Sequence, residues 1–258
     1  MTNALKTLFL GGYVMLTTGC ATGDSESFTF MADFPPDFTY EAVARYAPAK
    51  GETCTVKKPH IGYNQRWHLD YKERYKRDLE IPIYRTIEGC PLVIYRVEIK
   101  VYGTYGKHRG EFGVDSAMIV IREQLEDKYK GYFNSANESA INGQCQWLFR
   151  TMGAERYISK GLVCKKIDDH GLVTKGRPVG AYTLDQLPDK TVKLKINLTQ
   201  EEIPAIGDTW VKVPNGWKRC MGKALEDQYA FCFGNHKNFS SFKMPDGRSC
   251  TIYPNCTE

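Results

Sequence analysis

Hydrophobic and polar side chains alternate along several segments of the chain, and this pattern predicts a protein built largely from β-strands. In residues 97–101, and again in residues 192–198, aliphatic side chains occupy every second position and polar side chains lie between them. A period of two places one face of a strand in the core and the other in water. Strands are therefore expected in both segments. Further strands are expected over residues 116–122, 144–150 and 251–253, the last after the turn signal Pro245-Asp246-Gly247.

Helical patterns are fewer and shorter. Residues 38–46 contain Ala and follow a Pro-Asp pair, so two or three helical turns are expected there, and residues 123–132 form a second candidate. Residues 199–202 have the spacing of a capping box, but Pro204 keeps any helix there short. The predicted fold class is α+β and β-rich, with antiparallel sheets and a few short helices linked by disulfides.

An aromatic stripe in residues 67–79 allows two secondary structures. Trp67, Tyr71, Tyr75 and Leu79 recur every four residues, which fits a helix. Trp67 and Tyr71 also alternate with Leu69 as in a strand, so both alternatives stay open. In either case the stripe favours core packing over a binding surface.

A change in composition indicates where the chain divides. Residues 165–190 are rich in Gly, Asp, Lys and Pro, as is typical of a boundary between folded units. Two β-rich lobes are therefore expected, an N-terminal lobe over residues 28–166 and a C-terminal lobe over residues 167–258.

Residues 1–20 have the pattern of a secretory signal peptide. Lys6 supplies a positive charge, and a short apolar run ends at Leu16-Thr17-Thr18-Gly19-Cys20. Such a run is too short to span a bilayer, and small residues precede the expected cleavage point. The end of the segment resembles the lipobox of bacterial lipoproteins, with Thr17 where an apolar residue is usual. The resemblance implies that residues 1–19 are removed and Cys20 is acylated; an ordinary cleaved signal peptide is the alternative.

The residues after Cys20 indicate where the anchored protein resides. In the lipoproteins that this segment resembles, an Asp directly after the Cys tends to retain the protein at the inner membrane, and here that residue is Ala21. The expected location is therefore the periplasmic face of the outer membrane, with contact to the membrane through the lipid anchor. Residues 20–27 are small, polar and acidic, which predicts a flexible tether.

The cysteine content predicts disulfide bonds. Of nine cysteines, eight follow Cys20, an even number in an oxidising compartment. None forms a C-x-x-C pair, so neither a redox motif nor a zinc ribbon is indicated. A long gap divides the eight into two groups, and if each group closes on itself three pairings per group stay open. The candidates are Cys54, Cys90, Cys145 and Cys164 before the gap and Cys220, Cys232, Cys250 and Cys256 after it, with Cys145–Cys164 and Cys250–Cys256 as first choices.

Charge and motif content exclude several function classes. The formal net charge is only +5, and the chain lacks a long basic run, which argues against a nucleic-acid partner. The motifs G-x-S-x-G and H-E-x-x-H are absent. Asp168-Asp169-His170 has metal-ligand residue types, but its flanking lysines and glycine favour a solvated turn. We expect no enzyme, no cofactor and no metal, although a hydrolase assembled from distant residues stays open as a less favoured alternative.

Aromatic and basic side chains suggest contact positions for a protein partner. The chain has 16 Tyr, and residues 102–110 interleave Tyr, Gly and basic side chains directly after a predicted strand. Tyr offers rigid contact area and Arg offers bidentate donors, as in many exposed binding loops; a flexible connection without a partner is the alternative. The candidate contact residues are Tyr102, Tyr105, Lys107 and Arg109 in this loop and Trp217 in a second, shorter segment.

The middle of the chain resembles a family of Gram-negative lipoproteins. The resemblance covers residues 97–107, the stretch from Gly143 to Arg150 and the stretch from Gly161 to Lys165, together with the lipobox. These lipoproteins are encoded beside phospholipase effectors of the type VI secretion system. The resemblance implies an immunity protein that binds and inhibits a cognate phospholipase effector in the periplasm. A structural or assembly lipoprotein of the cell envelope is the alternative.

Overall fold

The structure, a computed structural model, describes residues 26–65, 78–224 and 227–256. The predicted signal peptide, the acylation of Cys20 and most of the predicted tether lie outside the described residues, as do Trp67, Tyr71 and Tyr75 of the aromatic stripe. Those expectations stay predictions. In the described ranges, no helix is both long enough and apolar enough to cross a membrane.

Strands account for nearly all of the regular structure in these ranges. The only helices described are two short 3-10 turns, η1 (Asp127–Tyr129) and η2 (Leu184–Gln186). The β-rich, disulfide-linked part of the predicted class is therefore confirmed, and the α+β assignment is not. The strands expected over residues 97–101, 116–122, 144–150 and 192–198 all form.

The helix predicted over residues 38–46 is wrong, because this segment is the long strand β2 (Phe38–Pro48). Tyr40, Ala42 and Ala44 are fully buried and alternate with partly exposed residues, so the period is two and not 3.6. Residues 123–132 form only η1, and residues 199–202 form no helix. The strand expected over residues 251–253 ends earlier, since β17 covers Ser249–Cys250 after the predicted turn.

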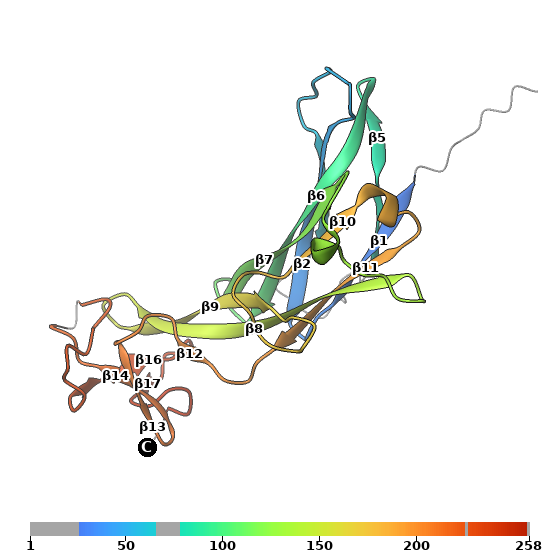
Figure 1. Ribbon diagram of the computed structural model, residues 1–258. Helices are drawn as coiled ribbons and strands as arrows, with labels where there is room; N and C mark the ends of the chain where they lie inside the picture. Colours follow the sequence, from blue (N-terminus) through green and yellow to red (C-terminus); the bar gives the residue numbers. More distant parts are fainter. Residues whose placement is uncertain (1–25, 66–77, 225–226, 257–258) are drawn as a thin grey trace, which may run out of the picture.

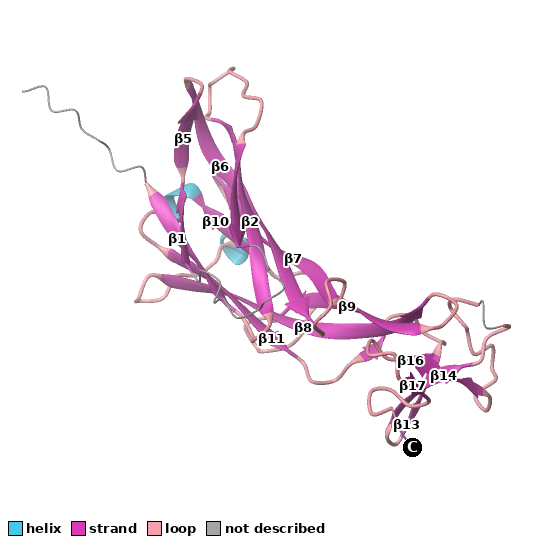
Figure 2. Cartoon of the chain, turned by 180° about the vertical axis from the view of Figure 1, so that it is seen from behind, coloured by secondary structure: helices cyan, strands magenta, loops and turns pink. Residues whose placement is uncertain are grey.

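Two large sheets and one small sheet make up the fold (Figures 1 and 2). The first large sheet mixes parallel and antiparallel pairs, since β11 is parallel to both β1 and β8, whereas β9 is antiparallel to β8. Its order is β17 (Ser249–Cys250), β16 (Phe242–Lys243), β9 (Tyr157–Lys166), β8 (Glu138–Met152), β11 (Thr191–Leu198), β1 (Ser27–Asp33) and β4 (Asp78–Pro82), with β12 (Ile203–Pro204) beside β8.

The second large sheet is mostly antiparallel and contains the β6–β7 hairpin. Its order is β10 (Val179–Thr183), β7 (Phe112–Arg122), β6 (Cys90–Thr104), β2 and β3 (His60–Gln65), with β5 (Tyr84–Ile87) beside β6. The small sheet consists of β13 (Trp210–Val213), β14 (Gly216–Cys220) and β15 (Phe239–Ser240).

The chain packs around two hydrophobic cores. The large core takes side chains from both large sheets, and the small core lies among the C-terminal strands. Strands β8 and β9 supply residues to both cores, so this long hairpin joins them. The molecule is elongated, with β13 to β17 at one end and β1 and β5 toward the other (Figures 1 and 2). The small core consists of Phe149, Ile158, Trp210, Phe242, Cys250 and Tyr253.

Strands β10 and β11 come from the predicted C-terminal lobe, but they pair with strands of the predicted N-terminal lobe. β10 is parallel to β7, and β11 is parallel to β1 and β8. Buried residues of the large core continue as far as Ile196. The change from the large core to the small core thus follows β11 and does not coincide with residue 166.

An ion pair bridges the two cores. The Lys160 ammonium lies 2.7 Å from a Glu202 carboxylate oxygen, and the Tyr253 hydroxyl donates a hydrogen bond to the other oxygen. The same ammonium lies 5.6 Å from the ring centroid of Tyr105 and 5.7 Å from that of Tyr253. Burial, with repulsion from the neighbouring carboxylate, raises the pKa of Tyr253 well above its ordinary value.

Four disulfides link the eight described cysteines, and each predicted group closes on itself. Both first-choice pairs, Cys145–Cys164 and Cys250–Cys256, are present. Cys145 and Cys164 stand opposite each other in the β8–β9 ladder. The other two bridges join Cys54 to Cys90 and Cys220 to Cys232.

Candidate functional site

The tip of the β6–β7 hairpin is an ordered loop. The Tyr105 N–H donates to the Glu111 carbonyl at 3.0 Å, and the buried Glu111 carboxylate accepts from the His108 N–H at 2.8 Å. A Cβ at position 106 would lie 2.0 Å from that carboxylate, so any larger residue would displace the Glu111 side chain. The loop therefore presents its outward side chains from a fixed backbone.

Two of the predicted contact residues in this loop are open to solvent. Lys107 and Arg109 are both exposed at the tip. In the described part of the chain, neither has a carboxylate within ion-pair distance, whereas Arg45, Arg96 and Lys100 on the neighbouring strands each do. Their charges are thus available to a partner, and the guanidinium of Arg109 offers the geometry for a bidentate contact.

Both tyrosines of the predicted loop make contacts within the folded protein. The Tyr102 hydroxyl donates to a Glu41 carboxylate oxygen at 3.2 Å. Tyr105 stands edge-on against Trp147 with ring centroids 5.4 Å apart and packs against the large core. Truncation of Tyr105 would therefore remove contacts of the large core, and its role as a contact residue stays a prediction.

The outer face of β7 carries apolar side chains that the sequence reasoning missed. Phe112 and Val114 are 37% and 46% exposed, and Val179 of the neighbouring β10 is 37% exposed. Met118 and Val120 continue the row, and Val179 pairs directly with Met118. We call these five residues the β7 face. A nearly continuous apolar run was the available signal, but such a run equally fits a strand buried on both sides.

Trp217 lies at the small core. The Trp217 ring centroid is 6.0 Å from the Phe149 ring centroid, and the Lys212 ammonium lies 5.5 Å from the Trp217 ring centroid. Trp217 is half-buried and pairs with Lys212 across the β13–β14 hairpin. The structure therefore separates Trp217 from the β6–β7 tip: Tyr102 and Tyr105 belong to the large core side, and Trp217 belongs to the small core.

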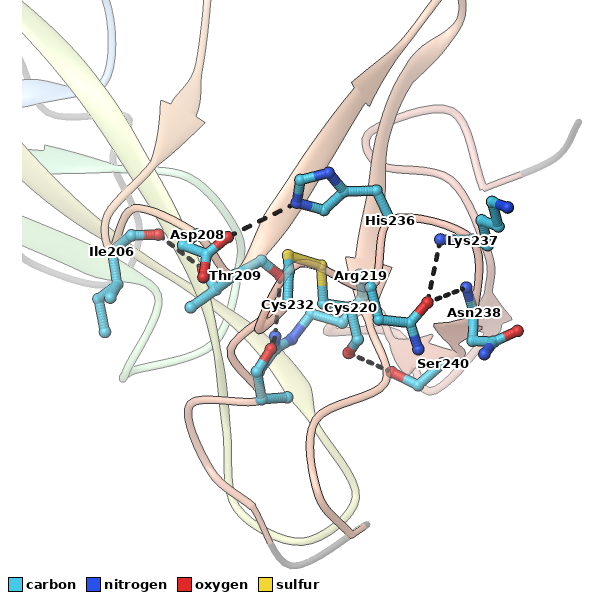
Figure 3. The surroundings of a disulfide bond; sticks show 12 residues. Ile206, Asp208, Thr209, Arg219, Cys220, Cys232, His236, Lys237, Asn238 and Ser240 are labelled. Atoms are coloured by element: carbon cyan, nitrogen blue, oxygen red, sulfur yellow. Dashed lines mark hydrogen bonds and ion pairs between the residues drawn. A yellow bond between two sulfur atoms is a disulfide. The ribbon is translucent and has the colours of Figure 1, made fainter.

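Two buried arginines, Arg156 and Arg219, donate hydrogen bonds to the segment around the Cys220–Cys232 bridge. Figure 3 shows Arg219 beside this bridge. Arg219 donates to the Thr151 hydroxyl at 2.8 Å and to the Thr209 and Ala230 carbonyls at 3.0 Å each. Burial, with repulsion from Arg156, lowers the pKa of Arg219 to about 10. The side chain is still a cation at neutral pH, solvated by carbonyl and hydroxyl oxygens in place of water.

Two groups of residues have side chains of metal-ligand type, Asp208 with Cys232 and His236, and the segment 168–170. Neither group offers a complete set of free ligand atoms in the disulfide-bonded protein. Asp208, Cys232 and His236 bring ligand atoms within 4.8 Å of one another, but the Cys232 sulfur is bonded to Cys220. An exposed Asp208 carboxylate oxygen instead lies 3.7 Å from the His236 Nε2 (Figure 3), which makes an ion pair only when the imidazole is protonated. Asp168 uses its carboxylate to accept the backbone N–H groups of His170 and Leu172, which closes a turn.

An open cavity of about 580 Å³ lies where β1 and β11 end. Its polar side chains include Asp33, Asn142 and Lys195, and its lining contains no Ser, Cys or His. A nucleophile with an adjacent base, as acyl transfer requires, is therefore not found among the described residues of this cavity.

Comparison of the chain with models of known protein families, with curated proteins and with solved structures finds no match. Functional inference therefore depends on the surfaces described above.

Proposed function

We propose that the protein is a lipid-anchored periplasmic immunity protein that binds and inhibits a cognate type VI phospholipase effector. The observation that carries the proposal is the β7 face beside the tip residues Lys107 and Arg109. It combines exposed apolar area with cations that have no carboxylate partner among the described residues, on a disulfide-linked sheet. Inhibition by binding requires such a surface and requires no catalytic group of its own.

The composition of this surface supports a protein partner. Soluble proteins seldom expose adjacent apolar side chains without a use for them. Phe112 and Val114 supply apolar area, and Arg109 at the adjoining tip supplies charge-assisted donors, the combination that dominates interface energies. Because the scaffold is ordered before binding, little conformational entropy is lost on association.

The proposed anchor at Cys20 supports the same function by location. A phospholipase delivered into the periplasm acts on membrane lipid, and a tethered inhibitor is confined near that lipid. Confinement raises the effective concentration of the inhibitor where the effector works.

The elongated shape favours one alternative, a structural or assembly lipoprotein of the envelope. Two cores joined by the β8–β9 hairpin separate the ends of the molecule (Figures 1 and 2). Such a shape suits a protein that bridges two components. Isolation of envelope assemblies with the protein, together with no binding to the phospholipase, would favour this function.

A matched pair of substitutions tests the β7 face. Val114 and Val173 are 46% and 48% exposed, but Val173 lies outside the face. We expect Val114→Glu to weaken the complex with the proposed cognate phospholipase effector by about 2 kcal/mol, or roughly 30-fold in Kd. Val173→Glu should leave the Kd unchanged. Titration calorimetry measures both, and equal affinity of the two variants would show that the face is not the contact.

A further inference from the structure

Three side chains of metal-ligand type meet at the Cys220–Cys232 bridge. The Cys232 sulfur, an Asp208 carboxylate oxygen and a His236 ring nitrogen all lie within 4.8 Å of one another. In the disulfide-bonded protein the Cys232 sulfur is bonded to Cys220 and is no ligand. Before the bridge forms, and whenever a reductant opens it, the same sulfur is a free thiol. The two redox states of this bridge therefore offer a metal ion different ligands.

The spacing and the chemistry of the three groups fit Zn²⁺. Two nitrogen or oxygen ligands on one tetrahedral zinc ion stand roughly 3.5 Å apart. The Asp208 oxygen and the His236 Nε2 are 3.7 Å apart, longer than a hydrogen bond and close to that separation. Zinc combines carboxylate, imidazole and thiolate ligands, whereas a thiolate is a poor ligand for Mg²⁺ or Ca²⁺. One carboxylate and one thiolate also neutralise the two charges of the ion.

The three groups are open to a metal ion from the solvent side. The side chains of His236 and Asp208 are 57% and 55% exposed, whereas Cys232 is only 3% exposed. Figure 3 shows the Asp208 carboxylate and the His236 ring facing each other beside the bridge. An ion can therefore meet the carboxylate and the imidazole first, and the thiolate then replaces one of its waters.

Hydrogen bonds that do not involve the bridge hold the backbone of these residues. The Cys232 N–H donates to the Asp208 carbonyl at 2.7 Å, and the Asn235 N–H donates to the Cys232 carbonyl at 2.8 Å. Arg219 donates to the carbonyl of Thr209, which directly follows Asp208, at 3.0 Å. Opening the bridge removes none of these bonds, so the three ligands stay close together in the dithiol form.

We propose that the dithiol form of the protein binds Zn²⁺ through Asp208, Cys232 and His236, and that closure of the Cys220–Cys232 bridge expels the ion. Three protein ligands leave the fourth tetrahedral position open, next to the Cys220 sulfur of the same bridge. Zinc binding then stabilises the native arrangement of this segment before the bridge forms. The inference does not depend on inhibition of a phospholipase.

The exchange between the two states balances as thiol–disulfide chemistry. The Cys220 thiolate attacks a disulfide oxidant, which releases one thiolate and leaves a mixed disulfide on Cys220. The Cys232 sulfur then leaves Zn²⁺ and attacks the Cys220 sulfur, which releases the second thiolate. The protein gives up two electrons, the oxidant receives them, each released thiolate takes up a proton, and Zn²⁺ returns to water.

Two serine variants of the full chain separate the ligand sulfur from loss of the bridge. Cys220→Ser keeps the Cys232 thiol and Cys232→Ser keeps the Cys220 thiol, and both retain the cysteines of the other three bridges. We expect Cys220→Ser to bind one Co²⁺ with a thiolate charge-transfer band, and to bind Zn²⁺ in competition about 100-fold more tightly than Cys232→Ser does. The oxidised wild type should show no such band.

Two exposed histidines provide a matched control for the imidazole ligand. In the Cys220→Ser chain, a further His236→Ala change should weaken Zn²⁺ binding by about 100-fold. His170 is also exposed, but it lies in the turn closed by Asp168, so His170→Ala should leave the Kd unchanged. Both changes remove an exposed ring, so a difference between them reports on coordination and not on folding.

Oxidative refolding of the reduced wild-type chain extends the test to the native cysteines. With glutathione disulfide as oxidant, Zn²⁺ should delay the Cys220–Cys232 bridge more than the other three, as followed by peptide mapping. Equal Zn²⁺ affinity of the two serine variants would overturn the proposal, as would equal effects of the two histidine changes. An equal delay of all four bridges would assign the effect to thiolates of the unfolded chain and would overturn it as well.

Discussion

At the scale of single residues, two buried arginines organise the C-terminal end of the molecule. Arg156 and Arg219 are among the largest fully buried side chains. Each donates mainly to backbone carbonyls, among them those of Met221 and Ala230 on either side of the Cys220–Cys232 bridge. A buried cation of this kind is costly to place but costly to remove as well, because its acceptors are then left without donors.

Replacing Arg219 should strongly destabilise the protein. In Arg219→Leu, the Thr209, Gln228 and Ala230 carbonyls lose their donor, and we expect the free energy of unfolding to fall by about 3 kcal/mol or more. The exposed Arg248 pairs only with Asp246, so Arg248→Ala should cost less than about 0.5 kcal/mol. Urea unfolding of both variants measures the difference. A loss below about 1 kcal/mol in Arg219→Leu would show that water replaces the guanidinium freely.

The buried Tyr253 should make stability depend on alkaline pH. Its pKa is raised in the folded protein, whereas in the unfolded chain it lies near 10. The unfolded state therefore loses a proton first, so the stability contribution is complete below pH ~10 and is lost as pH rises further, by up to about 1.4 kcal/mol per pH unit. We expect Tyr253→Phe to flatten this slope between pH ~10 and ~11.

Urea unfolding at a series of alkaline pH values checks this behaviour, with Tyr132→Phe as the matched exposed control. An unchanged slope in Tyr253→Phe would mean that other groups cause the alkaline loss. Tyr182 is the first of these to test, because burial raises its pKa as well.

At the scale of elements, period-two alternation predicted strands correctly, whereas residue composition typical of helices did not predict helices. The strand expected over residues 192–198 forms almost as predicted, as β11. Residues 38–46 contain Ala and follow Pro-Asp, yet they form β2, because pairing with β6 and β3 on both sides outweighs local propensity. The local sequence of β2 does not indicate its pairing with β6, which lies about fifty residues further along the chain.

The disulfide pairing was easier to predict than the helices, because the even number of cysteines and their spacing limit the possible pairs directly. An even count in two separated groups was enough to predict closure within each group, and Cys145–Cys164 follows from neighbouring strands. No comparable counting rule predicts the buried arginines or the β7 face. Arg219 can be buried because carbonyls such as that of Ala230 accept its hydrogen bonds. Val114 is exposed because other elements leave the outer face of β7 open. Both conditions depend on tertiary structure, which local sequence does not give.

The four disulfides should differ in their contribution to stability according to the length of chain they close. Sequence separations run from 36 for Cys54–Cys90 to 6 for Cys250–Cys256. Loop-closure entropy then predicts losses of about 4 kcal/mol for removal of the longest link and about 2 kcal/mol for the shortest. Paired Cys→Ala variants, compared by urea unfolding, test the order. A larger loss for Cys250–Cys256 would show that native packing around β17 outweighs chain entropy.

At the scale of the whole molecule, the fold is an elongated body with a different core toward each end. The β7 face and the Lys107–Arg109 tip lie on the large-core side, and strands β13 to β17 lie at the end that holds the small core. Composition suggested a division of the chain near residue 166, but β10 and β11 return to the large sheets. A composition shift marks a loop, and it carries no information on which sheet the next strand joins.

The central claim is stoichiometric inhibition of a cognate phospholipase, and a titration of enzyme activity tests it most directly. The purified full chain is added in increasing amounts to the phospholipase effector proposed as its partner, with hydrolysis of phospholipid vesicles as the readout. We predict that activity falls in proportion to the protein added and reaches zero at a fixed molar ratio, with a stable complex on size-exclusion chromatography. Full activity at a large molar excess of the protein, with no complex, would contradict the proposed function.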